Sequence, residues 1–132
     1  MKKWTTGLLL LFLLAGCGSP AQLESCRSTA DLFMERMAKG DFNGAYELCD
    51  PDSLTLDNLR AIANNSKFNA VMNDYKGIEH GEGGQKDERG DALEIRLAPA
   101  AFKGHEGYVA HFAFRQHPGH WKLIAFKIDT PK

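Results

Sequence analysis

The chain has 132 residues, and its 16 lysines and arginines nearly balance 17 aspartates and glutamates, for a formal net charge of −1 at pH 7. This length suits one small domain, which can bury a sizeable core without depending on disulfides to fold. There is no basic excess and no basic cluster of the kind that binds nucleic acid, so nucleic acid is not an expected partner.

The first part of the chain has the composition of a secretory signal peptide. Lys2 and Lys3 give it a positive start, the apolar run Leu8–Leu14 follows, and small residues then lead to Cys17. The run is too short to span a bilayer as a permanent helix. Its ending resembles the lipobox of bacterial lipoproteins, and the residues that carry this resemblance are Leu14-Ala15-Gly16-Cys17. The resemblance implies cleavage before Cys17, a diacylglyceryl group on its sulfur, and acylation of the new amino terminus, for example with palmitate. The alternative is a plain signal peptide with a chance cysteine.

These features divide the chain into residues 1–16 as the signal peptide, 17–24 as the lipidated cysteine and its tether, and 25–132 as the folded domain. Without the two lysines of the signal peptide, 14 basic and 17 acidic residues give a balance of −3. The membrane is the expected partner of Cys17, because stable anchoring needs more than one acyl chain. We therefore expect a cell-envelope location. Gly18, where an aspartate would retain the protein, favours the outer membrane facing the periplasm by resemblance to sorting rules in enteric bacteria. That inference lapses in a Gram-positive organism.

Two cysteines remain once Cys17 carries lipid. Cys26 and Cys49 form an even pair in an oxidising compartment, which favours a disulfide between them. The alternative is a pair of buried thiols that pack as small apolar side chains.

Three amphipathic helices are expected before any strand, over residues 25–40, 41–49 and 55–72. Asp41 and Thr55 are good amino-terminal caps for the second and third helices. The run Asn64-Asn65-Ser66 weakens the third helix, which can resume after it.

Four strands are expected in the second half, over residues 75–82, 92–97, 108–115 and 121–128, the first being the weakest. Residues 83–90 and 99–104 are interpreted as connections. Pro118-Gly119 suits a tight turn between the last two strands, in which Gln116 pairs with Trp121. Helices followed by strands indicate an α+β layer with the helices on one face of an antiparallel sheet.

At this point the chain resembles the NTF2-like (cystatin-like) superfamily. The residues that carry the resemblance are the two helices and turn of Ala30–Leu48, the long helix after Pro51, and the ending Trp121–Ile128. The resemblance covers residues 25–129 and implies three N-terminal helices on a curved four-stranded antiparallel sheet around a cone-shaped cavity. The small secreted lipoprotein branch, many of whose members have no assigned activity, is the most similar.

Regular alternation would make both faces of the last hairpin apolar. One face then carries Leu123 with Phe112 and Phe114, and the opposite face carries Phe126 and Ile128. NTF2-like domains often pair through the outer sheet face, so the resemblance suggests a homodimer or a docking surface for an envelope protein. The alternative is a bulge near Pro118-Gly119 that shifts the pairing by one residue.

A pocket or interface could be lined by aromatic side chains between helices and sheet, although such side chains more often fill a core. They are Phe33, Phe42, Phe112, Phe114, Trp121 and Phe126, with Tyr46 beside them.

Enzymes of this superfamily use an Asp or His base with a Tyr or acid donor. The resemblance makes His111, Tyr46, Tyr108 and Asp31 catalytic candidates, but no local motif places them together. His117 and His120 lack the further ligands that a metal site needs, so neither a metal nor a cofactor is expected. The leading expectation is a non-catalytic lipoprotein that binds a protein partner or a small apolar ligand. The alternative is a small isomerase, dehydratase or hydrolase with a His/Tyr/acid pocket.

Overall fold

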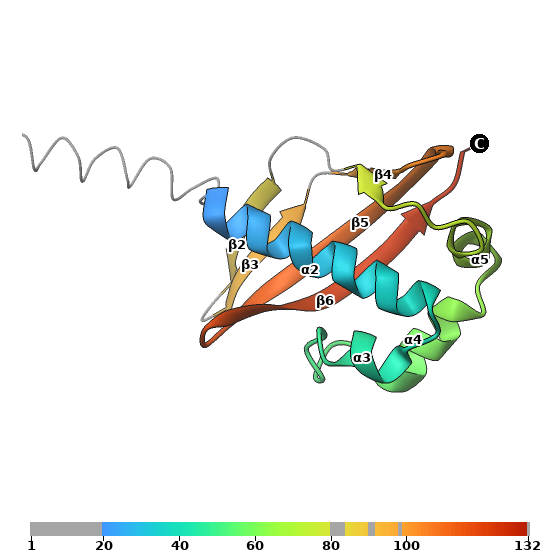
Figure 1. Ribbon diagram of the computed structural model, residues 1–132. Helices are drawn as coiled ribbons and strands as arrows, with labels where there is room; N and C mark the ends of the chain where they lie inside the picture. The colour runs from blue at the N-terminus through green and yellow to red at the C-terminus, as the bar shows by residue number, and fades with distance from the viewer. Residues whose placement is uncertain (1–19, 80–83, 90–91, 98, 132) are drawn as a thin grey trace, which may run out of the picture.

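The computed structural model describes residues 20–79, 84–89, 92–97 and 99–131. Within these ranges four helices precede a six-stranded sheet (Figure 1). The helices are α2 (Pro20–Ala38), α3 (Phe42–Tyr46), α4 (Leu56–Ala63) and α5 (Ser66–Met72). The strands are β1 (Ile78–Glu79), β2 (Gly84–Arg89), β3 (Ala92–Leu97), β4 (Ala100–Phe102), β5 (His105–His117) and β6 (His120–Asp129). The long helix α2 lies along one face of the sheet, so the fold is the expected α+β layer.

Short polar side chains decide where the helices after α2 begin. Asp41 accepts a hydrogen bond from the Gly44 backbone N–H at 3.0 Å and starts α3. Thr55 and Asn58 cap α4 reciprocally, because each side chain accepts from the other residue's backbone N–H. Asn65 accepts from the Lys67 N–H at 2.8 Å and starts α5 as a separate helix. The expected third helix is therefore two helices.

The first described helix begins earlier than the sequence predicted. It starts at Pro20 rather than Ser25, so part of the expected tether is helical, and Leu23 in it is buried. Proline is tolerated at the start of a helix because the first N–H groups have no partner within the helix.

Two strands lie where connections were expected, and that expectation was wrong. β2 pairs antiparallel with β3 from Gly84↔Leu97 to Arg89↔Ala92, inside the stretch interpreted as a loop. β4 pairs with both β1 and β5. Neither segment has the alternation of apolar residues that marks a strand in sequence. Both are held by pairing with a neighbouring strand, which a local pattern does not report.

The pairing of β5 with β6 combines a correct register with an unexpected bulge. Gln116 pairs with Trp121 as predicted, but Phe114 pairs with Leu123 while Ala113 pairs with Ala125. Ile124 is thus the extra residue of a β-bulge in β6. The bulge lies inside the strand and not near Pro118-Gly119, where the alternative placed it.

This bulge overturns the prediction of two apolar faces. After the extra residue, Phe126 returns to the side of the sheet that carries Leu123, and Ile128 follows it. The Phe126 ring lies 5.5 Å from Phe33, 6.1 Å from Phe68 and 5.2 Å from Phe112, measured between ring centroids. One apolar face therefore packs on the helices, with Phe126 at the meeting point of α2, α5 and β5.

We expect Phe126→Ala to lower the free energy of unfolding by about 3 kcal/mol, because it removes a ring that packs against three others. Ile124→Ala, in the bulge and outside the aromatic group, should cost about 1 kcal/mol. Urea unfolding of the two variants measures both values. Equal costs would contradict the inward position of Phe126.

Candidate functional site

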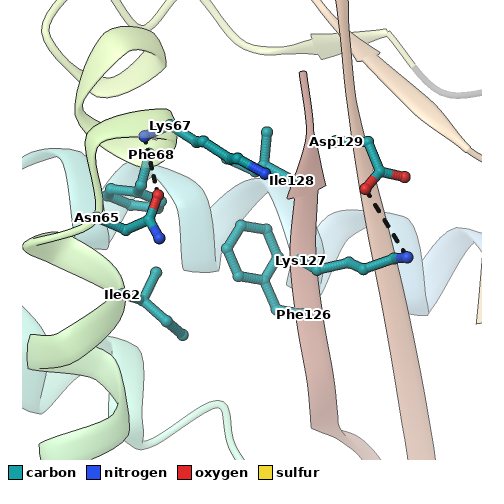
Figure 2. A pocket seen from close by; sticks show the side chains of 8 residues that line it. All are labelled: Ile62, Asn65, Lys67, Phe68, Phe126, Lys127, Ile128 and Asp129. Atoms are coloured by element: carbon teal, nitrogen blue, oxygen red, sulfur yellow. Dashed lines mark hydrogen bonds and ion pairs between the residues drawn. The ribbon is translucent and has the colours of Figure 1, made fainter. Parts of the chain in front are cut away.

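A pocket of about 310 Å³ lies between the α4–α5 corner and the last strand (Figure 2). We call it the edge pocket. Four apolar or aromatic side chains and four polar ones line it, namely Ile62, Asn65, Lys67, Phe68, Phe126, Lys127, Ile128 and Asp129. Its volume is at the lower end of the range for ligand sites, and its mixture of apolar wall and polar rim is typical of them.

Of the two lysines that line the edge pocket, one has a carboxylate partner among the described residues and one does not. The Lys127 ammonium lies 3.8 Å from a carboxylate oxygen of Asp129. Asp129 also contacts His111 Nε2 at 2.8 Å through its other oxygen. Lys67 is exposed and makes no ion pair with any other residue that the structure describes. The rim therefore carries a net positive charge next to an apolar wall.

The aromatic residues singled out in the sequence mostly fill the core. Phe33, Phe112, Phe114 and Trp121 are buried, and Phe42 and Tyr46 are half-buried and packed against that core. Phe126 is the one member of this group that lines the edge pocket. The other apolar lining residues, Ile62, Phe68 and Ile128, appeared in the sequence only as parts of helix and strand patterns.

A second hollow of about 360 Å³ lies on the opposite face of the sheet, which we call the outer groove. Ala113 and Ala125 face each other across β5 and β6, and Arg96 and Lys127 also line the groove. His111 lies here with its side chain one-third exposed. Leu97, Phe112 and Phe126 also line the groove, beside the two alanines and the charged side chains. Ile128, which regular alternation placed on this face, is buried and lines the edge pocket instead.

The four catalytic candidates do not share a described pocket. His111 lines the outer groove, and Asp31 lines a third, shallow hollow with Glu35 and Tyr75. Tyr46 and Tyr108 line none of these three pockets. The partner that the fold gives His111 is Asp129, which the sequence analysis did not single out.

Tyr75 was also missed by the sequence analysis. Burial raises the pKa of its phenol, and the nearby carboxylates of Asp31 and Glu35 raise it further. The phenol therefore stays protonated and can act as a hydrogen-bond donor in that shallow hollow.

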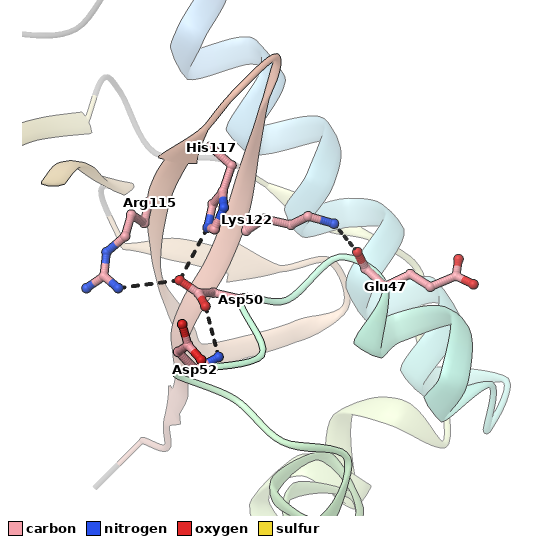
Figure 3. A network of polar contacts seen from close by, with 6 residues as sticks. All are labelled: Glu47, Asp50, Asp52, Arg115, His117 and Lys122. Carbon is pink, nitrogen blue, oxygen red and sulfur yellow. Dashed lines mark hydrogen bonds and ion pairs between the residues drawn. The ribbon is translucent and has the colours of Figure 1, made fainter.

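Asp50 is the buried charged side chain of the described part, and it joins the helices to the hairpin (Figure 3). Its Oδ2 lies 3.4 Å from Arg115 Nη1 and 3.3 Å from His117 Nε2, and its Oδ1 accepts from the Asp52 backbone N–H at 2.9 Å. Nearby, Lys122 Nζ donates to the Glu47 carbonyl. These bonds, together with a short parallel bridge from Cys49 to Leu123, fix the α3–α4 connection against β6. We interpret this network as structural, because a buried carboxylate is costly unless it is paired.

The disulfide expected between Cys26 and Cys49 is not formed. Both residues are free and buried, and the Cys49 thiol donates to the Ala45 carbonyl at 3.4 Å. Burial raises the pKa of each thiol to about 12, with Asp50 also raising and Lys122 lowering that of Cys49. They match the alternative of buried thiols that pack as small apolar side chains.

No three His, Cys, Asp or Glu side chains gather as a possible metal site within the described ranges. His117 and His120 stack with ring centroids 5.9 Å apart. No helix in the described part is long and apolar enough to cross a membrane.

Solved structures with a similar backbone show which fold this is. An NTF2-like protein with a cystatin-like fold from Novosphingobium aromaticivorans aligns over 94% of this chain and 87% of its own, at 18% identity and a TM-score of 0.51. A candidate dehydratase of the NTF2-like family from Streptomyces avermitilis aligns over 86% of this chain and 99% of its own, at 18% identity and a TM-score of 0.46. No family model and no curated protein matches the sequence. The chain therefore has an NTF2-like, cystatin-like α+β fold, with a curved sheet that does not close into a barrel.

The two buried thiols should be unreactive in the folded protein. With Cys17→Ala, Ellman's reagent at pH 8 should titrate no thiol before denaturation and both Cys26 and Cys49 after it, because the thiolate is the reacting form. A disulfide would leave no thiol to titrate after denaturation without reductant.

The same thiols give stability a pH dependence with a defined sign. An unfolded thiol loses its proton near its ordinary pKa of 9.0 and the folded thiol only near about 12. The contribution of each buried, protonated thiol to the free energy of unfolding is therefore fully present below pH 9 and is lost as the pH rises towards 12. Urea midpoints between pH 8 and pH 11 should fall less steeply for Cys26→Ala than for the parent.

Proposed function

We propose that this protein is a lipoprotein anchored in the cell envelope through Cys17, and that its NTF2-like domain is a binding module and not an enzyme. The observation that carries the binding proposal is the edge pocket, where apolar side chains of α4, α5 and β6 meet under a cationic rim. A protein segment or small molecule with an apolar group would bury that group against Phe68 and Phe126.

The anchor proposal comes from the sequence, whose first residues lie outside the described ranges. Two signals support it, a short apolar run after Lys2 and Lys3 and the lipobox-like ending at Cys17. The outer membrane facing the periplasm is the favoured location in a Gram-negative host. The outer groove is a second surface through which a homodimer or an envelope protein could attach.

We expect Cys17→Ala to release the protein from the membrane fraction, because it removes the sulfur that would carry the lipid. Intact-mass measurement of the parent should give a chain that starts at Cys17 with added acyl mass. Cys49→Ala, a matched replacement of a buried thiol, should stay in the membrane fraction. Unmodified parent in the soluble fraction would contradict the anchor.

The edge pocket should take up a neutral apolar dye. N-phenyl-1-naphthylamine should fluoresce with the Cys17→Ala chain, and Ile62→Trp should abolish this signal because the larger ring fills the pocket. Ile124→Trp makes the same replacement of a half-buried isoleucine outside the pocket and should keep the signal. Equal signals from both variants would contradict binding at the edge pocket.

A small isomerase, dehydratase or hydrolase is the second candidate. The contact of 2.8 Å between His111 Nε2 and Asp129 favours it, because a carboxylate can orient an imidazole that acts as a base. His111 lines the outer groove and not the edge pocket, whereas Asp129 lines the edge pocket. His111→Gln should therefore keep the binding of the neutral dye at the edge pocket and would abolish any turnover that depends on this pair.

A further inference from the structure

We propose that the edge pocket and the free edge of β6 together form a groove that binds an extended segment of a partner protein by adding a strand to the sheet. The segment would carry apolar side chains at alternate positions and a carboxylate near Lys67. This inference rests on the proposed binding function and specifies what is bound.

The outer edge of β6, opposite β5, forms backbone hydrogen bonds to a described segment at one residue, Leu123. The Leu123 N–H donates to the Leu48 carbonyl at 2.9 Å, and the Leu123 carbonyl accepts from the Asp50 N–H at 2.8 Å. Both groups of Leu123 thus point away from β5. Beyond Leu123, no backbone group of β6 bonds to any described segment outside the sheet. The strand therefore has an open edge from residue 125 to residue 129.

The bulge decides which residues present their backbone groups at this edge. Along a regular strand, alternate residues direct their N–H and C=O groups to the same side. Ile124 adds one residue after Leu123, so the next outward groups belong to Phe126 and Ile128. The side chains of these two residues line the edge pocket. Free backbone groups and an apolar wall therefore coincide at the same two residues.

Because Phe126 and Ile128 present both their backbone groups at the edge and their side chains in the edge pocket, they determine where the side chains of an added strand would lie. Residues directly opposite each other in a ladder place their side chains on the same face of the sheet. Partners of Phe126 and Ile128 would direct alternate side chains into the edge pocket, against Ile62 and Phe68 on the helices. The groove thus offers both elements of strand addition, backbone pairing for affinity and a pocket for specificity.

The positive charge beside the groove favours a bound segment with an acidic group, and features of the edge strand disfavour pairing with unrelated strands. Lys67, which has no ion pair among the described residues, stands at the rim, and Lys127 is held only at 3.8 Å by Asp129. A lysine and a bulge on an edge strand also discourage indiscriminate sheet growth. The free edge is short, which suits recognition of a few residues.

The test uses the full lipidated chain in lipid nanodiscs and a short fluorescein-labelled peptide of alternating valine and threonine that ends in aspartate. Fluorescence polarisation should show saturable binding. Methylating the peptide nitrogens along one edge removes backbone donors without changing side chains, and should weaken binding by about tenfold or more. Hydrogen exchange of the 124–129 segment should slow when the unmethylated peptide binds.

Charge reversal tests the position of the acidic group. Lys67→Glu should weaken binding of the aspartate peptide by about threefold and improve binding of a lysine-ended peptide by a similar factor. Lys103→Glu, an exposed lysine away from the groove, should change neither.

Three results would overturn strand addition. The first is that the methylated peptide binds as tightly as the unmethylated one. The second is that no peptide binds although the apolar dye still does. The third is that, without peptide, segment 124–129 is protected from hydrogen exchange to a degree that grows with protein concentration. The last result would mean that a second copy occupies the edge. Loss of both dye and peptide binding would instead remove the proposed binding function itself.

Discussion

Phe126 reaches the rings of Phe33, Phe68 and Phe112 because Ile124 adds one residue to the last strand. Without that residue, regular alternation would direct Phe126 to the opposite face of the sheet, and every later side chain of β6 would change face with it. The contact between helices and sheet on this side of the molecule therefore depends on the bulge. Backbone bonds from Leu48 and Asp50 to Leu123 hold the neighbouring part of β6 against the α3–α4 connection, and the Asp50 carboxylate joins the same connection to β5.

The same bulge shapes both hollows that involve β6. By turning Phe126 and Ile128 inward it supplies the apolar wall of the edge pocket, and by turning Ala125 outward it places that residue beside Ala113 in the outer groove. The two sites have different chemistry as a result. The edge pocket offers apolar surface beside the outer edge of β6. The outer groove offers His111, whose partner Asp129 lines the edge pocket.

Much of the helical half could be predicted because its signals are local. Asp41 and Thr55 cap helices through bonds to residues close in sequence, and the run at Asn64-Asn65 places a cap where α5 begins. The pairing of Gln116 with Trp121 could be predicted because Pro118-Gly119 is a typical sequence for a tight turn. The strands β2 and β4 could not be predicted in this way, since their positions come from hydrogen bonds to strands elsewhere in the chain.

The sequence by itself determined the fold class, the starts of α3 and α4, the register of the final turn and the expectation of a lipid anchor at Cys17, because each depends on neighbouring residues. Only the tertiary structure decided which face Phe126 occupies, that Asp129 is the partner of His111, and that Cys26 and Cys49 are buried as free thiols. Each of these outcomes depends on contacts between residues far apart in the chain. A single extra residue in a strand reverses the faces while leaving the sequence pattern almost unchanged.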